Sequence, residues 1–299
     1  MLLSTYNGEA YLAAQLDSLA AQKDVDVEVF VRDDGSTDGT LAILARHADR
    51  WPALAAPMTG PNLGPARSFL ALLAAAPGDF DYYAFCDQDD VWLPEKLGRA
   101  SRRLAQEGGA PALYCARVLC VDAQLRPLGE RWIGGDASFE HLLFENIAFG
   151  TTLVMNAPAR SGIVAQTPGP GLIMHDWWCA LWASAFGVIV RDDRATILYR
   201  QHGSNAVGSS PNWLNETSAR LRGLLRDPGA FYPIHAQAEE FLRLHGDRLS
   251  PARRSLASKL VASRGSVRKR LAYAMFGTVV RSGIIKGLVA RALIALDLY

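Results

Sequence analysis

Residues 80–92 have the sequence FDYYAFCDQDDVW, an apolar and aromatic run that ends in a cluster of carboxylates. The run Phe80–Cys86 has the length and composition of a buried β-strand. Asp87, Asp89 and Asp90 would repel one another unless a cation lay between them, and Mg²⁺ or Mn²⁺ binds through one or two carboxylates plus substrate phosphates. The stretch therefore predicts a metal site that holds a diphosphate. The alternative is a solvated acidic turn that caps the helix expected next.

Strand-like and helix-like segments alternate before that run. They predict strands at 1–5 and 25–31, and helices at 9–22, from residue 41 onward, and at 66–76 after a turn at 60–65. Such alternation is typical of βαβ units and a largely parallel sheet, in which ligands bind beyond the carboxyl ends of the strands. Polar side chains follow these ends at Tyr6, Asp33, Asp34, Arg67 and Asp87–Asp90. The shared edge predicts a single binding site.

The second half of the chain has a less regular pattern. It predicts an apolar helix at 177–186 and short strands, one or two of them within 112–121 and one each at 150–156, 188–191 and 195–199. Beyond about residue 209 the pattern is helical to residue 299, with breaks at prolines.

The charges are distributed unevenly along the chain. A formal net charge of +1 argues against a general affinity for nucleic acid. Of the 31 Lys and Arg and 30 acids, residues 250–299 contain ten bases and one acid, Asp297, so that this tail carries +9 and the rest carries −8. An acidic body followed by a basic, apolar tail predicts two modules.

The four cysteines, Cys86, Cys115, Cys120 and Cys179, form no CxxC pair and lie in apolar surroundings. They are expected to be buried free thiols in a reducing compartment. The start of the chain has no basic segment followed by an apolar one, and no run reaches the roughly 18 apolar residues of a spanning helix. These features predict a cytoplasmic protein.

Three further polar groups each have two interpretations. Asp33 and Asp34 precede a glycine. A carboxylate there can accept a hydrogen bond from the imide N–H of a base or from a ribose hydroxyl, or it can build a turn and cap a helix. Asp176 lies at a helix start beside tryptophans and suits a general base, or else caps an amphipathic helix. His202 lies in a polar loop, where it completes a metal shell or is merely exposed. Its neighbour Arg200 is a candidate for a phosphate contact.

Five motifs occur in a fixed order: Ser4-Thr5-Tyr6-Asn7-Gly8, Asp33-Asp34-Gly35-Ser36-Thr37-Asp38, Asn62-Leu63-Gly64, Phe85-Cys86-Asp87-Gln88-Asp89-Asp90-Val91-Trp92 and His175-Asp176-Trp177-Trp178. Together they resemble the inverting family 2 glycosyltransferases of the rhamnosyltransferase-like kind, over roughly residues 1–205. The resemblance implies an α/β protein of GT-A fold, with a Rossmann-like, mostly parallel central sheet flanked by helices. It also implies a catalytic domain at 1–208, made of a nucleotide-sugar-binding half (1–110) and an acceptor-binding half (111–208), followed by a helical, basic C-terminal region at 209–299.

The resemblance carries site roles as well. The residues that would bind the nucleotide sugar are Ser4, Tyr6, Asp33, Asp34, Arg67, Asp87 and Gln88, with Asp34 facing the base. Asp87-Gln88-Asp89 matches the DxD motif, so Asp89 would be the leading ligand of Mg²⁺ or Mn²⁺, aided by Asp87, Asp90 and His202. Asp176 matches the catalytic base, normally the Asp of a Glu-Asp pair. His175 replaces the Glu here, as in rhamnosyltransferase-like members.

The activity implied is transfer of a sugar to a hydroxyl of a glycan or lipid-linked acceptor, with inversion and with deoxythymidine-diphosphate-rhamnose (dTDP-rhamnose) as the favoured donor. The alternatives are a UDP-hexose-dependent glycosyltransferase, a nucleotidyltransferase and a non-catalytic nucleotide-sugar-binding module. The Gln-x-x-Arg-Trp motif of processive synthases is missing, which favours addition of one sugar or a few. Family members usually have several more apolar residues before the first motif, so either the first strand is short or the chain starts upstream of Met1.

The basic tail places Arg281, Lys286 and Arg291 among apolar helical runs. Basic residues beside apolar helix faces predict interfacial helices on an anionic leaflet. That would hold the protein peripherally on the cytoplasmic face of the inner membrane. The alternatives are that these helices pack on the catalytic domain or pair in a homo-oligomer.

Overall fold

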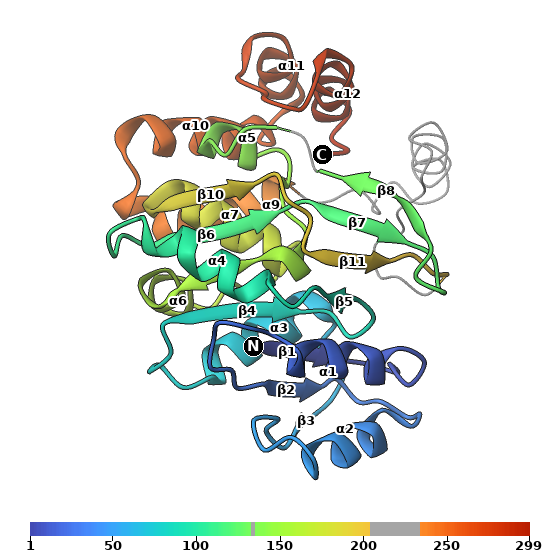
Figure 1. Cartoon of the computed structure of the whole chain (residues 1–299). Helices are drawn as coiled ribbons and strands as arrows, with labels where there is room; N and C mark the ends of the chain where they lie inside the picture. The colour runs from blue at the N-terminus through green and yellow to red at the C-terminus, as the bar shows by residue number, and fades with distance from the viewer. Residues whose placement is uncertain (133–134, 204–233) are drawn as a thin grey trace.

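A seven-stranded sheet forms the centre of the computed structural model (Figure 1), which describes residues 1–132, 135–203 and 234–299. Its strand order is β10-β6-β9-β4-β1-β2-β3, and a smaller sheet has the order β5-β11-β7-β8. The strands are β1 (Leu2–Thr5), β2 (Phe30–Asp33), β3 (Met58–Thr59), β4 (Tyr82–Cys86), β5 (Val91–Trp92), β6 (Ala112–Ala116), β7 (Val118–Val121), β8 (Pro127–Arg131), β9 (Val154–Asn156), β10 (Val188–Asp192) and β11 (Ile197–Arg200).

The central sheet is mostly parallel. β1 pairs in parallel with β2 and β4, β2 with β3, and β10 with β6, whereas β9 runs antiparallel to both β4 and β6. Because β1, β2 and β4 run in the same direction, their carboxyl ends lie at one edge, where the predicted site residues follow them. This mixed, mostly parallel sheet flanked by helices confirms the predicted fold class.

Helices cover both faces of the sheet. They are α1 (Leu12–Ala20), α2 (Thr40–Ala48), α3 (Pro65–Ala75), α4 (Lys96–Ala105), α5 (Phe139–Leu142), α6 (Ala157–Val164), α7 (His175–Phe186), α9 (Ile234–His245), α10 (Pro251–Ser263), α11 (Val267–Phe276) and α12 (Ile284–Ala295). Two short 3₁₀ turns are η1 (Gly150–Thr152), which replaces the first part of the strand expected at 150–156, and η3 (Gly246–Arg248).

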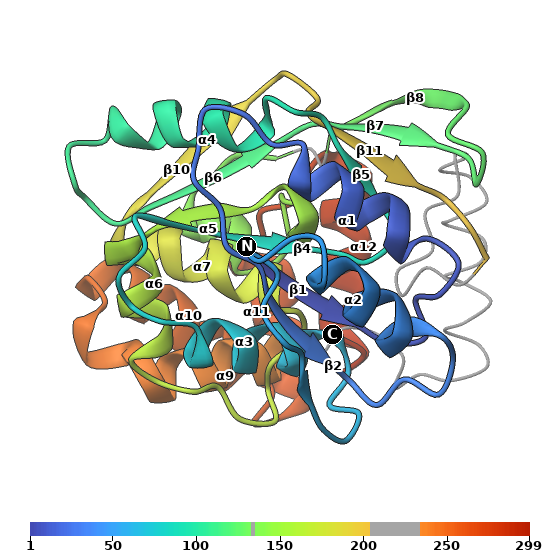
Figure 2. The same cartoon turned by 60° about the horizontal axis from the view of Figure 1, so that its bottom comes forward.

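Alternate strand residues point into two separate cores, as the period of two in a strand requires. Leu2 and Phe85 lie in the core formed with α3, α6, α7 and the C-terminal helices. Leu3 and Cys86 lie in the core formed with α1, α2 and α4. In Figure 2, α1 and α4 lie toward the top and α3, α9 and α10 toward the bottom. All four cysteines are buried and free, as predicted.

Two elements differ from the sequence expectations. The strand predicted at 25–31 begins only at Phe30, where its pairing with Leu2 of β1 begins. Val91 and Trp92 were expected to belong to a turn that leads into a helix with Pro94 at its first position. Instead they form β5 and pair with β11, because a partner strand more than a hundred residues later accepts their backbone, and α4 begins at Lys96.

The C-terminal helices pack in the same core as α7. Phe241 of α9, Leu260 of α10, Tyr273 of α11 and Ile294 of α12 share a core with Trp178 of α7. In Figure 1, α11 and α12 form the outermost layer at the top. Residues 204–233, which include the predicted boundary between 208 and 209, lie outside the described residues. Within the ranges that are described, no helix is both long and apolar enough to cross a membrane.

Candidate active site

A carboxylate and an imidazole meet in the turn after β4. Oδ2 of Asp89 lies 2.9 Å from Nε2 of His202, and both side chains are largely buried. His202 follows β11, and its ring lies against Tyr11 with the ring centroids 4.7 Å apart. Two of the predicted metal-ligating residues, 113 positions apart in the sequence, are therefore in direct contact.

Arg200 fixes the same turn from the β11 side. Its amide donates to Oδ1 of Asp90 at 3.0 Å, its Nε donates to the carbonyl of Asp89 at 2.8 Å, and its guanidinium lies 4.5 Å from the centroid of the Tyr11 ring. A third bond runs from the guanidinium to the carbonyl of Ala123 at 2.6 Å. Arg200 is buried. Its contacts hold residues 87–90, called the acidic turn below, in their conformation.

The acidic turn carries more negative charge than its surroundings neutralise. Burial, followed by the charge of Asp89, raises the pKa of Asp87 to about 8 and that of Asp90 well above its usual range. Asp176 raises the pKa of Asp87 further, so the predicted base and the acidic turn lie in one electrostatic field. A divalent cation would relieve such an excess of charge. Asp90 is completely buried and binds the amide of Arg200, so its observed contact shapes the turn.

Gln88 ties the turn to the loop after β1. Its Oε1 accepts from the amide of Tyr6 at 2.8 Å, and its Nε2 donates to the carbonyl of Tyr6 at 3.0 Å. A Cβ at Gly8 would lie 2.4 Å from Oε1 of Gln88, so only glycine allows this close approach. The ring of Tyr6 is about half exposed. Gln88 therefore positions the Tyr6 loop through both ends of its amide.

The carboxylate of Asp33 organises the loop that follows β2. It accepts hydrogen bonds from the Thr5 hydroxyl at 3.0 Å, from the Ser36 amide at 2.8 Å and from the Ser36 hydroxyl at 2.6 Å. Asp33 is buried. The loops after β1 and β2 are thus joined at the predicted binding edge.

Asp34 organises the neighbouring loop before α3. It is buried and forms an ion pair with Arg32, and its two oxygens accept from the amides of Leu63 and Gly64 at 2.9 Å each. Oγ of Ser4, at the end of β1, lies 2.7 Å from the hydroxyl of Ser68 on α3. These contacts bring Ser4 and Asp34 next to the start of α3. That the two residues line a nucleoside pocket, with Asp34 facing the base, stays a prediction.

Asp176 lies in the first turn of α7, which begins at His175, two residues earlier than expected. The residue is 8% exposed, and burial raises its pKa to about 6. Hydrogen bonds from the amide of Trp177, at 2.6 Å, and from the side chain of Asn146 lower that pKa. At neutral pH the carboxylate is therefore ionised and able to accept a proton.

His175, the residue before Asp176, is buried and packs against aromatic rings. Its ring stacks on Phe69 of α3 with centroids 4.1 Å apart and meets the edge of Phe85 of β4 at 4.8 Å. A Cβ at Gly150 would lie 2.9 Å from its Nε2. Burial lowers the pKa of His175 to about 3, so the ring is neutral at physiological pH.

Among the predicted site residues, Tyr6, Asp34, Asp87–Asp90 and His202 follow the ends of β1, β2, β4 and β11. Ser4 and Asp33 lie within the last two residues of β1 and β2, Asp176 lies in the first turn of α7, and Arg67 is exposed in the first turn of α3. Among the residues with described positions, no group of three His, Cys, Asp or Glu side chains already converges as a metal site. Two candidate metal ligands do meet, Asp89 and His202, and the carboxyl of Asp87 lies in the same electrostatic field. This set of groups suits Mg²⁺ or Mn²⁺. These cations complete their coordination with phosphate oxygens and water.

Three residues at this edge were not expected from the sequence. Tyr11 supports Arg200 and His202, but in the sequence it was simply one of the apolar positions of a helix. Arg32 pairs with Asp34, and its place two residues before that carboxylate was the available signal. Asn146 bonds to Asp176, and no local pattern distinguished it from other loop asparagines.

A sequence profile described as glycosyl transferase family 2 matches residues 2–151, just over half of the chain. The chain belongs to glycosyl transferase family 2. It is 29% identical over 234 residues to a Shigella flexneri protein named dTDP-rhamnosyl transferase RfbG, covering 75% of this chain and 79% of that protein. It is 30% identical over 207 residues to an uncharacterized protein of Mycobacterium tuberculosis, covering 66% of this chain and 57% of the relative.

Solved structures show the same fold as this family 2 glycosyltransferase. The structure of S. aureus TarS 1–349 in complex with UDP-GlcNAc superposes with a TM-score of 0.56 and 16% identity, and covers 100% of this chain and 88% of that one. The TarS 1–349 complex with UDP gives a TM-score of 0.54 and 18% identity. At such identities the likeness concerns the fold alone.

Proposed function

We propose that the protein transfers rhamnose from dTDP-rhamnose to a hydroxyl of a glycan or lipid-linked acceptor, with inversion and with the help of a divalent cation. Its class, a glycosyltransferase, follows from the family. The similarity to the S. flexneri protein named as a dTDP-rhamnosyl transferase supports the donor. The observation that carries the proposal is the contact of Asp89 with His202 at 2.9 Å, in a turn that Gln88 ties to the loop after β1.

The donor side is formed by the loops after β1, β2 and β4. Ser4 and Asp33, near the ends of β1 and β2, and Tyr6 and Asp34, just after them, would cradle the nucleoside. Gln88 fixes the Tyr6 loop relative to the acidic turn. Asp89 and His202 would hold Mg²⁺ or Mn²⁺, with Asp87 as the adjacent carboxylate and Asp90 as the residue that shapes the turn. When bound, the cation neutralises charge on the departing diphosphate. Arg67 is exposed at the start of α3 and offers a guanidinium to a phosphate.

The acceptor side provides the base. The Asp176 carboxylate takes the proton of the acceptor hydroxyl while that oxygen attacks the anomeric carbon of the donor. The bond between the anomeric carbon and the phosphate oxygen breaks, and its electron pair leaves with the nucleoside diphosphate. A single displacement of this kind inverts the anomeric configuration. Because His175 is neutral, no imidazolium pairs with the Asp176 carboxylate and weakens it as a base.

The chain organisation proposed for this reaction is a donor half at 1–110, an acceptor half at 111–208 and a C-terminal region at 209–299. We place the protein in the cytoplasm, peripherally at the inner face of a membrane. The described part of the chain contains no helix fit to span a bilayer, and the tail from 250 to 299 carries +9.

The experiment is a donor screen with the full chain. The protein is incubated with Mg²⁺ and, in turn, with dTDP-rhamnose and several UDP-hexoses, and the nucleotide released is quantified. We expect dTDP release from dTDP-rhamnose to be fastest, and chelation of the metal to stop it. Faster release of UDP would show that a UDP-hexose, and not dTDP-rhamnose, is the donor. Release of pyrophosphate or a monophosphate would exclude glycosyl transfer of this type. Tight donor binding without any release would indicate a non-catalytic module.

A further inference from the structure

We propose that the outer face of α11 and α12 docks onto an anionic lipid surface. The outer face consists of large apolar side chains that point away from the protein: Val267, Leu271, Met275, Phe276, Ile284, Ile285, Leu288, Val289 and Leu296. Docking would present the active site to a lipid-linked acceptor, and this consequence rests on the proposed function. The docking itself does not.

Eight of the nine residues of the outer face are more exposed than any other large apolar residue that the structure describes. Phe276 is 84% exposed, Ile284 83% and Ile285 75%. The same helices bury their opposite sides, with Tyr273 and Ile294 in the core, so the exposed residues are not loosely packed core. Figure 1 shows α11 and α12 side by side as the outermost layer. Large apolar side chains exposed on two adjacent helices are typical of an interaction site.

The two helices are too short to cross a bilayer. α12 has 12 residues and α11 has ten, which at 1.5 Å per residue gives about 18 Å and 15 Å, against the roughly 30 Å of a hydrocarbon core. An apolar face on short helices is suited to lie in the interfacial region, where its side chains reach the acyl boundary. The geometry therefore favours surface docking over insertion.

The positive charge of the tail indicates that the outer face binds an anionic surface. Residues 250–299 contain one acid, Asp297, which already pairs with Arg264 and Arg270. Arg268 and Lys269 are exposed on α11, and no ion pair seen in the described residues involves them. A second copy of the chain would bring a +9 tail against a +9 tail, which like-charge repulsion disfavours. An anionic leaflet attracts the same bases.

A cavity lies at the edge of the outer face, between α10 and α11. Its volume is about 690 Å³. Lys259 and Lys269 line it together with Tyr273 and Phe276, and Glu140 contributes one carboxylate. Cationic side chains beside apolar walls match the polar–apolar boundary of a phospholipid headgroup region.

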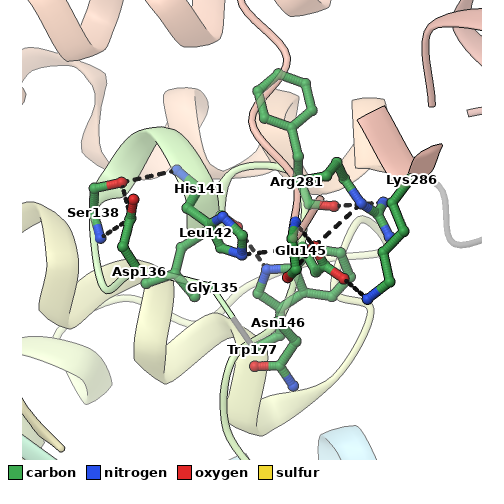
Figure 3. Close-up of polar contacts among 12 residues, drawn as sticks. Gly135, Asp136, Ser138, His141, Leu142, Glu145, Asn146, Trp177, Arg281 and Lys286 are labelled. Atoms are coloured by element: carbon green, nitrogen blue, oxygen red, sulfur yellow. Dashed lines mark hydrogen bonds and ion pairs between the residues drawn. The ribbon is translucent and has the colours of Figure 1, made fainter. Parts of the chain in front are cut away.

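The outer face is rigidly tethered to the acceptor side (Figure 3). Oε2 of Glu145 accepts from the amide of Ser282 at 2.7 Å, and its Oε1 accepts from Nζ of Lys286 at 2.8 Å. Arg281 adds an ion pair to the same carboxylate at 3.4 Å. The next residue, Asn146, bonds to the side chain of Asp176. Docking of α11 and α12 would therefore fix the orientation of the base relative to the lipid surface.

The test is co-sedimentation of the full chain with vesicles, without donor or acceptor, so that it is independent of catalysis. Vesicles of phosphatidylcholine are compared with vesicles that also contain phosphatidylglycerol. We expect binding to the anionic vesicles at low salt and at least tenfold weaker binding by the double variant Phe276→Ser/Ile284→Ser. The matched control is Met58→Ser/Leu128→Ser, which removes two exposed apolar side chains from β3 and β8 and should bind like the wild type.

A charge-reversed pair completes the test. Arg268→Glu/Lys269→Glu should weaken binding to anionic vesicles at least fivefold. The control Arg46→Glu/Arg50→Glu, which changes two exposed bases on α2 and in the turn after it, should have a smaller effect. Failure of the wild type to bind at low salt, or equal binding by the test and control variants, would overturn the proposal. So would a dimer in vesicle-free solution that Phe276→Ser/Ile284→Ser converts to a monomer, because the occupant would then be a second copy.

Discussion

Replacement of Glu145 by glutamine should destabilise the protein strongly, although the residue belongs to none of the five motifs. Its side chain is only 10% exposed and holds the segment between α11 and α12 through Arg281, Ser282 and Lys286. Burial alone would raise the pKa of Glu145, but these partners overcome it and lower the pKa to about 2 from an ordinary value of 4.5. Glu145→Gln removes the charge and leaves the two bases without their carboxylate.

The pKa shift gives the magnitude. A difference of about 2.5 pH units corresponds to about 3 kcal/mol of stability at pH 7. Because the folded-state pKa is the lower one, this stabilisation is fully present above pH 4.5 and is lost as the pH falls toward 2. Linkage predicts that about 0.8 kcal/mol is lost between pH 7 and pH 4, and about 2 kcal/mol by pH 3.

The assay is urea unfolding of the wild type and Glu145→Gln at pH 7 and pH 4. The variant should be less stable by about 3 kcal/mol at pH 7, and the gap should narrow at pH 4. The control is Glu130→Gln, since Glu130 is more than half exposed and its ion pair with Arg117 spans 4.0 Å. It should change stability by no more than about 0.5 kcal/mol. Equal stability of Glu145→Gln and wild type at pH 7, or a gap that does not depend on pH, would refute the assigned role.

Three predictions concern the active site. Asp89→Asn should keep the fold and lose about a hundredfold or more in turnover, and near-normal turnover at saturating Mg²⁺ would argue against the metal assignment. The value of kcat/KM should fall as the pH drops through about 6, where the Asp176 base becomes protonated, and Asn146→Ala should move that midpoint upward because it removes a bond that lowers the pKa. Gly8→Ala should displace Gln88 and weaken donor affinity, measured by calorimetry, with little change in melting temperature.

The sheet and its binding edge were predictable because they depend on local patterns. Strands β1 and β4 are apolar runs that end in polar residues, and the carboxyl ends of parallel strands must share an edge. By contrast, β5 forms through pairing with a strand about a hundred residues later. No periodicity within Val91 and Trp92 encodes that partner.

The candidate site was predictable in its residues but not in their contacts. Asp33 and Asp34 were expected to face a ligand, whereas the structure shows that both also fasten loops through Thr5, Arg32 and the amides around Leu63. A turn aspartate can do either, and sequence spacing does not distinguish the two. Likewise, the apolar residues of the tail could be assigned to core or surface only once α11 and α12 were seen to bury one side each.

Transfer of rhamnose with Asp176 as the base is tested most directly by phosphorus NMR of the reaction with dTDP-rhamnose and Mg²⁺, run with wild type and Asp176→Asn. We expect wild type to convert the donor into free dTDP. Asp176→Asn should do so at least a hundredfold more slowly while binding the donor with unchanged affinity. Appearance of a monophosphate or pyrophosphate, or equal rates for the two proteins, would contradict this mechanism.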